Sequence, residues 1–182
     1  MSSRILVAGI GNVFLGDDAF GVEVVRRLAT RPIAEEVVVK DFGTRGFDLA
    51  FALDSAEVII IVDAASRGEV PGTLYTIEPE LEGLPPLGHS DDPSDGPDAH
   101  AMDPIQVFRL ARHMNVVPGR ILLVGCEPES FGPENLGRMG MSAVVEAAVD
   151  RAVDLIDELI VQLRKVERHE LAKGLQHGKA AV

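Results

Sequence analysis

Four side chains with acid-base or metal-binding chemistry stand beside predicted strands and helices: Asp18, Asp41, Asp63 and His100. The aspartates come at or shortly after the ends of apolar segments typical of strands, and the histidine comes just before a predicted helix. In open α/β sheets the carboxyl ends of parallel strands line one edge, where ligands bind. We therefore expect these side chains to meet at that edge. Two carboxylates and one imidazole suit a divalent first-row metal, with positions left for water or substrate.

Each acidic position also has a structural interpretation. Asp63 closes the apolar run 58–62, and a half-desolvated carboxylate is costly unless it is paired, hydrogen-bonded or bound to a cation. Its alternative role is an N-cap or acceptor for the turn that follows. Asp17 and Asp18 both suit the first turn of a helix, where carboxylates are favoured, and we expect one of them to do only that.

The turn Gly9-Ile10-Gly11 also resembles the start of a dinucleotide-binding loop, with Asp41 as the acid that would bind ribose hydroxyls. The position of the third glycine holds Phe14. Asp17 and Asp18 would place negative charge where a pyrophosphate binds. A nucleotide-binding α/β enzyme is therefore the weaker alternative.

Cys126 directly follows a predicted buried strand and would be a nucleophile if His100 and an aspartate were its partners. A cysteine in such a place is more often an inert core residue. We therefore assign Cys126 to packing and the segment 126–129 to the wall of a cleft. A single cysteine also excludes an internal disulfide framework and agrees with a reducing compartment.

Apolar patterning predicts alternating strands and helices, which is typical of an α/β fold. The predicted strands run from 4 to the Gly9 turn and over 36–42, 58–62, 73–77 and 120–125, with 73–77 suited to a sheet edge. The predicted helices cover 19–31, 47–56, 104–114 and a long last segment capped by Ser142. The stretch 78–98, rich in Pro, Gly, Ser and Asp, predicts a long loop. The apolar stripe of the last helix fades near 168, so we expect one domain over 1–168 and a disordered tail over 169–182.

Composition narrows the classes of function. With 29 acidic and 17 basic residues the formal charge is −12, which disfavours nucleic acid and anionic membrane surfaces as partners. No apolar run approaches the roughly 18 residues of a membrane helix, and no basic region with a following apolar stretch and cleavage site opens the chain. We expect a soluble, cytoplasmic protein.

An ordered set of short motifs resembles the nickel-iron hydrogenase maturation endopeptidases over about residues 4 to 165. The set comprises Gly9-Ile10-Gly11-Asn12, Leu15-Gly16-Asp17-Asp18-Ala19-Phe20-Gly21, Asp41-Phe42-Gly43-Thr44, Asp63-Ala64, an isolated histidine before the third helix, Gly125-Cys126-Glu127-Pro128-Glu129 and Gly140-Met141-Ser142. The resemblance implies a single-domain, three-layer α/β sandwich. Its twisted, mostly parallel sheet would have about five strands, with helices on both faces.

The same resemblance implies an aspartyl-type endopeptidase activity that removes a C-terminal extension from a hydrogenase large-subunit precursor after nickel insertion. It places a metal-binding triad on Asp18, Asp63 and His100, where the first position is often Glu in the family. The nickel would belong to the substrate, so the protein needs no cofactor of its own, although nickel or zinc would fit the site. Asp41 is the candidate for orienting the substrate backbone or acting as base. We expect a monomer, and a non-enzymatic metal-binding assembly factor remains the other alternative.

Overall fold

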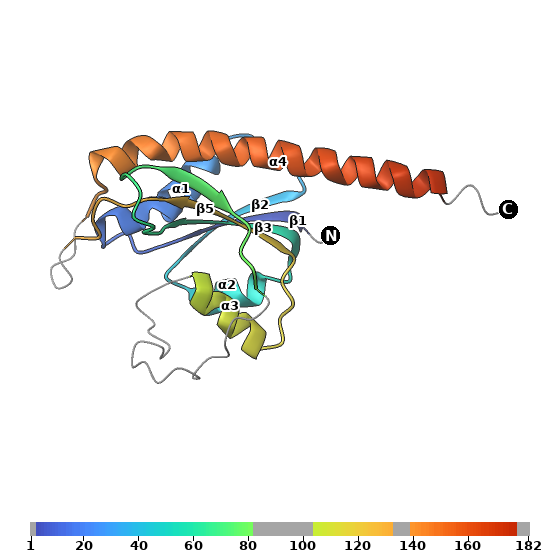
Figure 1. Cartoon of the computed structure of the whole chain (residues 1–182), viewed down its shortest axis with the longest axis horizontal. Helices are drawn as coiled ribbons and strands as arrows, with labels where there is room; N and C mark the ends of the chain where they lie inside the picture. Colours follow the sequence, from blue (N-terminus) through green and yellow to red (C-terminus); the bar gives the residue numbers. More distant parts are fainter. Residues whose placement is uncertain (1–2, 82–103, 133–138, 178–182) are drawn as a thin grey trace.

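The protein is a three-layer α/β sandwich, seen edge-on in the computed structural model (Figure 1), which describes residues 3–81, 104–132 and 139–177. The sheet has the order β2-β1-β3-β5-β4 and is parallel except for β4. This confirms the predicted fold class. The elements in chain order are β1 (Ser3–Ile10), the 3₁₀ helix η1 (Gly16–Ala19), α1 (Phe20–Leu28), β2 (Val37–Gly43), α2 (Gly46–Ala52), β3 (Ala56–Ala64), β4 (Leu74–Ile77), α3 (Pro104–His113), β5 (Arg120–Cys126) and α4 (Ala143–His177).

Each face of the sheet has its own helical cover, because successive side chains of a strand point to opposite faces. Ile5 and Val7 of β1 join the core formed with α1 and α4. Leu6, Ala8 and Ile10 join the core formed with α2 and α3. Burial on both faces explains why the parallel strands are almost continuously apolar. The alternating strand β4 lies at the edge of the sheet, as its pattern predicts, and pairs antiparallel with β5.

Small residues let η1 and α1 approach the strand ends closely. A Cβ at Gly21 would overlap the carbonyl oxygens of Val62 and Ile10, and a Cβ at Gly11 would overlap the carbonyl oxygen of Asp18. Gly11 also has a φ of 127°, which L side chains rarely adopt. Gly11 therefore lets Asp18 lie against the end of β1. Gly21 packs against Val62 of β3, the residue that precedes Asp63.

The last helix packs against α1 and extends past the sheet. Its apolar residues are buried from Val145 to Leu163, and Arg27 of α1 pairs with Asp150 of α4 at 3.2 Å. The helix then continues to His177 and projects past the sheet (Figure 1). The helix thus enters the segment for which the sequence predicts a disordered tail. Strong helix formers between 167 and 173 extend the helix by intrinsic propensity, without an apolar stripe.

Candidate active site

The carboxyl ends of β1 and β3, two adjacent parallel strands, bring two of the predicted acidic residues to one edge of the sheet. Asp18 lies in η1, which contacts β3 as well as α1. Asp63 is the second-to-last residue of β3 rather than following the strand, since β3 continues to Ala64. Asp18 and Asp63 thus both lie at the carboxyl edge of the sheet.

Asp17 is a fully buried carboxylate whose hydrogen bonds are all structural. Its Oδ2 accepts the backbone N–H groups of Glu129 at 2.8 Å and Ser130 at 2.9 Å. Its Oδ1 accepts the backbone N–H of Ser142 at 2.6 Å, and the Ser142 hydroxyl donates to Oδ2 at 3.1 Å. Burial alone would raise the pKa of Asp17, but these bonds outweigh it and hold the pKa below its usual 3.8. Asp17 therefore ties the loop after β5 and the start of α4 to η1.

Asp18 differs from its neighbour in every one of these respects. It is half-buried, and among the described residues a single hydrogen bond reaches its carboxylate, from the backbone N–H of Asn12 to Oδ2 at 2.6 Å. Desolvation by burial raises the pKa of Asp18 above its usual value, although the Asn12 bond opposes the shift. A carboxylate that is costly to ionise and sparsely hydrogen-bonded gains most from a cation. Of the two adjacent aspartates, Asp18 is the one whose carboxylate is sparsely hydrogen-bonded.

Asp63 is 3% exposed and faces the α2–α3 side of the sheet, the side to which Ile59 and Ile61 point. It is in register with Gly125 of β5, which in turn is in register with Tyr75 of β4. These three residues form a row across the sheet with their side-chain positions on one face. Asp63 thus has a neighbour without a side chain, and beyond it a tyrosine.

Asp41, near the carboxyl end of β2, has its side chain on the other face of the sheet from Asp63. Its carboxylate pairs with Arg26 of α1, whose Nη2 lies 3.0 Å from Oδ2. It therefore lies on the α1–α4 side of the sheet, opposite to Asp63. The position of Asp41 at a strand end is as predicted, but the alternation of β2 turns its side chain to the other face.

Two residues that the sequence did not single out hold the segment after Asp63. The Tyr75 hydroxyl donates to the carbonyl oxygen of Ala65 at 2.6 Å. The buried Glu127 carboxylate accepts the backbone N–H of Arg67 at 2.7 Å and the Ser66 hydroxyl at 3.0 Å. Burial would raise the pKa of Glu127, yet these bonds hold it below the usual value. The only sequence signal was the cleft-wall prediction for 126–129, which did not distinguish Glu127.

Comparisons with known proteins assign the chain to a family. The sequence profile of the hydrogenase maturation proteases matches residues 22–159. The chain belongs to this family. The hydrogenase expression/formation protein HoxM of Cupriavidus necator is 34% identical over 156 residues, 84% of this chain and 73% of that protein. The hydrogenase 2 maturation protease of Escherichia coli is 32% identical over 155 residues, 84% of this chain and 88% of that protein.

Solved structures agree with the sequence relatives. The hydrogenase 2 maturation peptidase from a Thaumarchaeota archaeon is 31% identical with a TM-score of 0.63, and the match covers 86% of this chain and 97% of that one. The hydrogenase maturating endopeptidase HybD from Escherichia coli is 28% identical with a TM-score of 0.64, covering 90% and 93%. The family predicted by the motifs is confirmed, and this maturation protease is an enzyme of the peptidase class.

The third predicted ligand of the protease, His100, lies outside the described residues, as does most of the predicted loop over 78–98. The described chain resumes at α3, on the same side of the sheet as Asp63. Within 3–81, 104–132 and 139–177 no group of three or more His, Cys, Asp or Glu residues is placed to hold a metal ion. The described part of the site therefore supplies two carboxylates.

Other chemistries fit the edge less well. Cys126 is fully buried in the core under α4, and desolvation raises the pKa of its thiol to about 11, so it is a protonated core residue at neutral pH. The approach that a dinucleotide would need at Gly11 is filled by the backbone of Asp18. Among the described residues no helix combines the length and apolarity needed to cross a bilayer.

Proposed function

We propose that this protease removes the C-terminal extension of a nickel-iron hydrogenase large-subunit precursor, and that it recognises nickel already seated in that precursor. The observation that carries the proposal is the pair Asp18 and Asp63. Both are desolvated carboxylates at the ends of adjacent strands, and the pKa of Asp18 is raised by burial. Such a pair gains most when a cation that a substrate carries enters between them.

His100 completes the proposed set of ligands. In this proposal Asp18, Asp63 and His100 bind the nickel of the precursor and so hold the scissile peptide beside it. The protease has no metal of its own, so a precursor without nickel is not held and is not cleaved. Nickel or zinc alone also fits an oxygen and imidazole ligand set. Asp41, which pairs with Arg26, is the candidate for orienting the substrate backbone or acting as base.

The proposal is tested by mass spectrometry of the large-subunit precursor after incubation with the protease. The nickel-loaded precursor should lose the mass of its C-terminal extension, and the nickel-free precursor should keep its mass. Asp18→Asn, Asp63→Asn and His100→Ala should each abolish the loss of mass, and Asp150→Asn, at an exposed aspartate of α4, is the control that should retain it. Cleavage of nickel-free precursor at the same rate would refute recognition of the substrate metal.

A non-enzymatic assembly factor would give a different result, because it would bind nickel or precursor without changing the precursor's mass. A nucleotide-binding enzyme would be stabilised against heat by an adenosine or nicotinamide nucleotide, since a ligand that binds only the native state raises the melting temperature. We expect no such stabilisation. We also expect a cytoplasmic monomer, which sedimentation and cell fractionation would test.

A further inference from the structure

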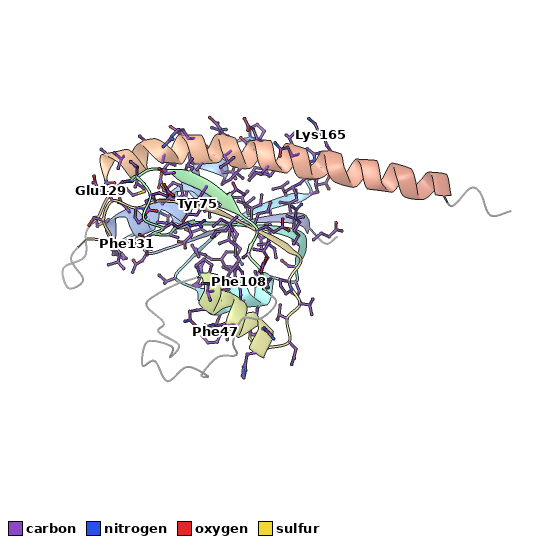
Figure 2. The ribbon with its side chains drawn as sticks, in the orientation of Figure 1. Phe47, Tyr75, Phe108, Glu129, Phe131 and Lys165 are labelled. Atoms are coloured by element: carbon purple, nitrogen blue, oxygen red, sulfur yellow. The ribbon has the colours of Figure 1, made fainter. Side chains whose placement is uncertain are left out.

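Tyr75 occupies the space that the missing side chain of Gly125 leaves next to Asp63. A Cβ at Gly125 would overlap Cε2 and Cζ of the Tyr75 ring and lie 2.5 Å from its hydroxyl oxygen. Gly125 is in register with Asp63 on the neighbouring strand, and neighbouring strands lie about 4.8 Å apart. The phenol group is thus about one strand spacing from the Asp63 backbone, on the face to which Asp63 points. Figure 2 shows Tyr75 in the same half of the molecule as Glu129.

The Tyr75 ring is held from two directions. Gly125 lies under the end of the ring, and the Arg67 guanidinium carbon lies 5.1 Å from the ring centroid. The hydroxyl donates its proton to the Ala65 carbonyl at 2.6 Å, so the ring cannot rotate away without losing that bond. This proton is committed, because burial and the negative charges of Asp63 and Glu127 raise the pKa of Tyr75 to about 12. Tyr75 is therefore a fixed, neutral side chain rather than an acid or base.

The hydroxyl bond fixes the chain immediately after Asp63. The β3–β5 ladder ends with Ala64, which is in register with Cys126, and the backbone N–H of Ala65 still donates to the Cys126 carbonyl at 3.1 Å. The Ala65 carbonyl points instead to Tyr75. Both peptide groups of Ala65 are thus held, one by backbone and one by a side chain from β4. Without the phenol the Ala65 carbonyl would lose this partner, and the segment after β3 would be held only by the Ala65 N–H and by the bonds of Glu127 to residues 66–68.

We propose, on the basis of the function proposed above, that Tyr75 is a positioning residue that holds Asp63 in the orientation needed to bind the substrate's metal. Its ring closes the β4 side of Asp63, and its hydroxyl fixes the chain at Ala65. The residue touches neither metal nor scissile bond. It acts through Asp63, and its loss should weaken metal binding without unfolding the protein.

Tyr75→Phe tests this role, because it keeps the ring over Gly125 and removes only the hydroxyl. We expect zinc affinity to fall and KM for the nickel-loaded precursor to rise by about three- to tenfold, the value of one hydrogen bond of this kind, with little change in kcat. Ser55→Ala is the matched control. It removes another hydroxyl that donates to a backbone carbonyl at 2.6 Å, that of Ala52, at the opposite end of β3. The control should leave zinc affinity and KM unchanged.

Gly125→Ala supplies a second variant, because its Cβ displaces the same ring. Zinc affinity should fall at least as far as in Tyr75→Phe. The double variant Gly125→Ala/Tyr75→Phe should bind no more weakly than Gly125→Ala alone, since a displaced hydroxyl has nothing left to lose. Additive losses would show that the two residues act separately and would overturn the proposal.

The unmodified protein offers a measurement that does not depend on any variant. Tyr75 is the one tyrosine and the chain has no tryptophan, so ultraviolet difference absorption and emission report this ring alone. Saturating zinc should change both signals, and Asp63→Asn should abolish the change. An unchanged spectrum with zinc bound, or Tyr75→Phe indistinguishable from Ser55→Ala, would overturn the role of Tyr75. If wild-type protein cleaves nickel-loaded precursor in that case, the proposed function stands without it.

Discussion

The adjacent residues Asp17 and Asp18 should respond in opposite ways to the same substitution. In Asp17→Asn one of the two carboxylate oxygens becomes an NH₂ group. The best amide orientation keeps the oxygen at the Oδ2 position, where Glu129, Ser130 and the Ser142 hydroxyl donate. The NH₂ group then faces the backbone N–H of Ser142.

The structure sets the size of the effect. A buried N–H without an acceptor costs about 1–3 kcal/mol, and each remaining bond weakens by about 1 kcal/mol when its acceptor loses its charge. The amide avoids the desolvation of a charge, which offsets part of this loss. We expect Asp17→Asn to lower the free energy of unfolding by about 3 kcal/mol. In a chain of 182 residues this lowers the melting temperature by about 6–12 °C.

The pH dependence of folding stability tests the direction of the effect independently. Because folding lowers the pKa of Asp17 below its usual 3.8, its stabilisation is fully present above about pH 4 and is lost as the pH falls through the folded value. Wild-type protein should therefore lose stability steeply below pH 4, and Asp17→Asn should lose less. Folding raises the pKa of Asp18, so its ionised form opposes folding at neutral pH. Asp18→Asn should be at least as stable as wild type and inactive on the nickel-loaded precursor.

Urea denaturation at pH 7 and pH 3.5 measures all three proteins on one scale. The interpretation fails if Asp17→Asn is as stable as wild type at pH 7, or if Asp18→Asn is the variant that unfolds. A stable, fully active Asp18→Asn would move the ligand role to another residue.

Three further predictions concern the frame around the site. Gly21→Ala should yield little soluble protein because its Cβ overlaps two carbonyl oxygens, whereas Gly68→Ala, at a φ of 80° with open space around it, should fold with a loss of about 1–3 kcal/mol in urea denaturation. Cys126→Ala should retain precursor processing, and complete loss of activity in a folded variant would restore a thiol mechanism. The wild-type thiol should resist iodoacetamide at pH 8 in the native protein, because burial raises its pKa to about 11, and should react in urea. Deleting 170–182 should shift the melting temperature by less than about 2 °C, since the apolar stripe in the sequence of the last helix fades near 168, and a larger fall would show that this end of the helix packs.

Local patterns in the sequence were sufficient to predict most of the fold. The apolar runs gave the five strands, the alternation of 73–77 gave the edge strand, and Ser142 caps α4 with its hydroxyl accepting the Val145 N–H at 3.4 Å. Boundaries moved where tertiary contacts decided them. The helix predicted over 19–31 begins at Phe20, directly after η1, and ends at Leu28, and the one predicted over 47–56 ends at Ala52.

The site was less predictable because it depends on which face a side chain takes and on partners far away in sequence. Asp41 and Asp63 both come at strand ends, but the pleat and the Arg26 pair place them on opposite faces. Asp17 was expected to serve its own helix, yet its partners are 112 to 125 residues away. The sequence did not indicate Tyr75. Its position near Asp63 depends on the antiparallel pairing of β4 with β5 and the parallel pairing of β5 with β3, which only the assembled sheet defines.

The long-range bonds of Asp17 also constrain the order in which the protease is completed. Asp17 is made early in synthesis, but its carboxylate accepts hydrogen bonds from residues 129, 130 and 142. These residues leave the ribosome after all five strands. Contacts of such sequence separation close late in folding, since the cost of closing the loop comes before the gain. The loop after β5 and the start of α4, which Asp17 holds against η1, are therefore among the last parts of the protein to form. A nascent chain that ends before residue 142 has its strands but no finished site, so proteolytic competence begins only when the start of α4 has emerged.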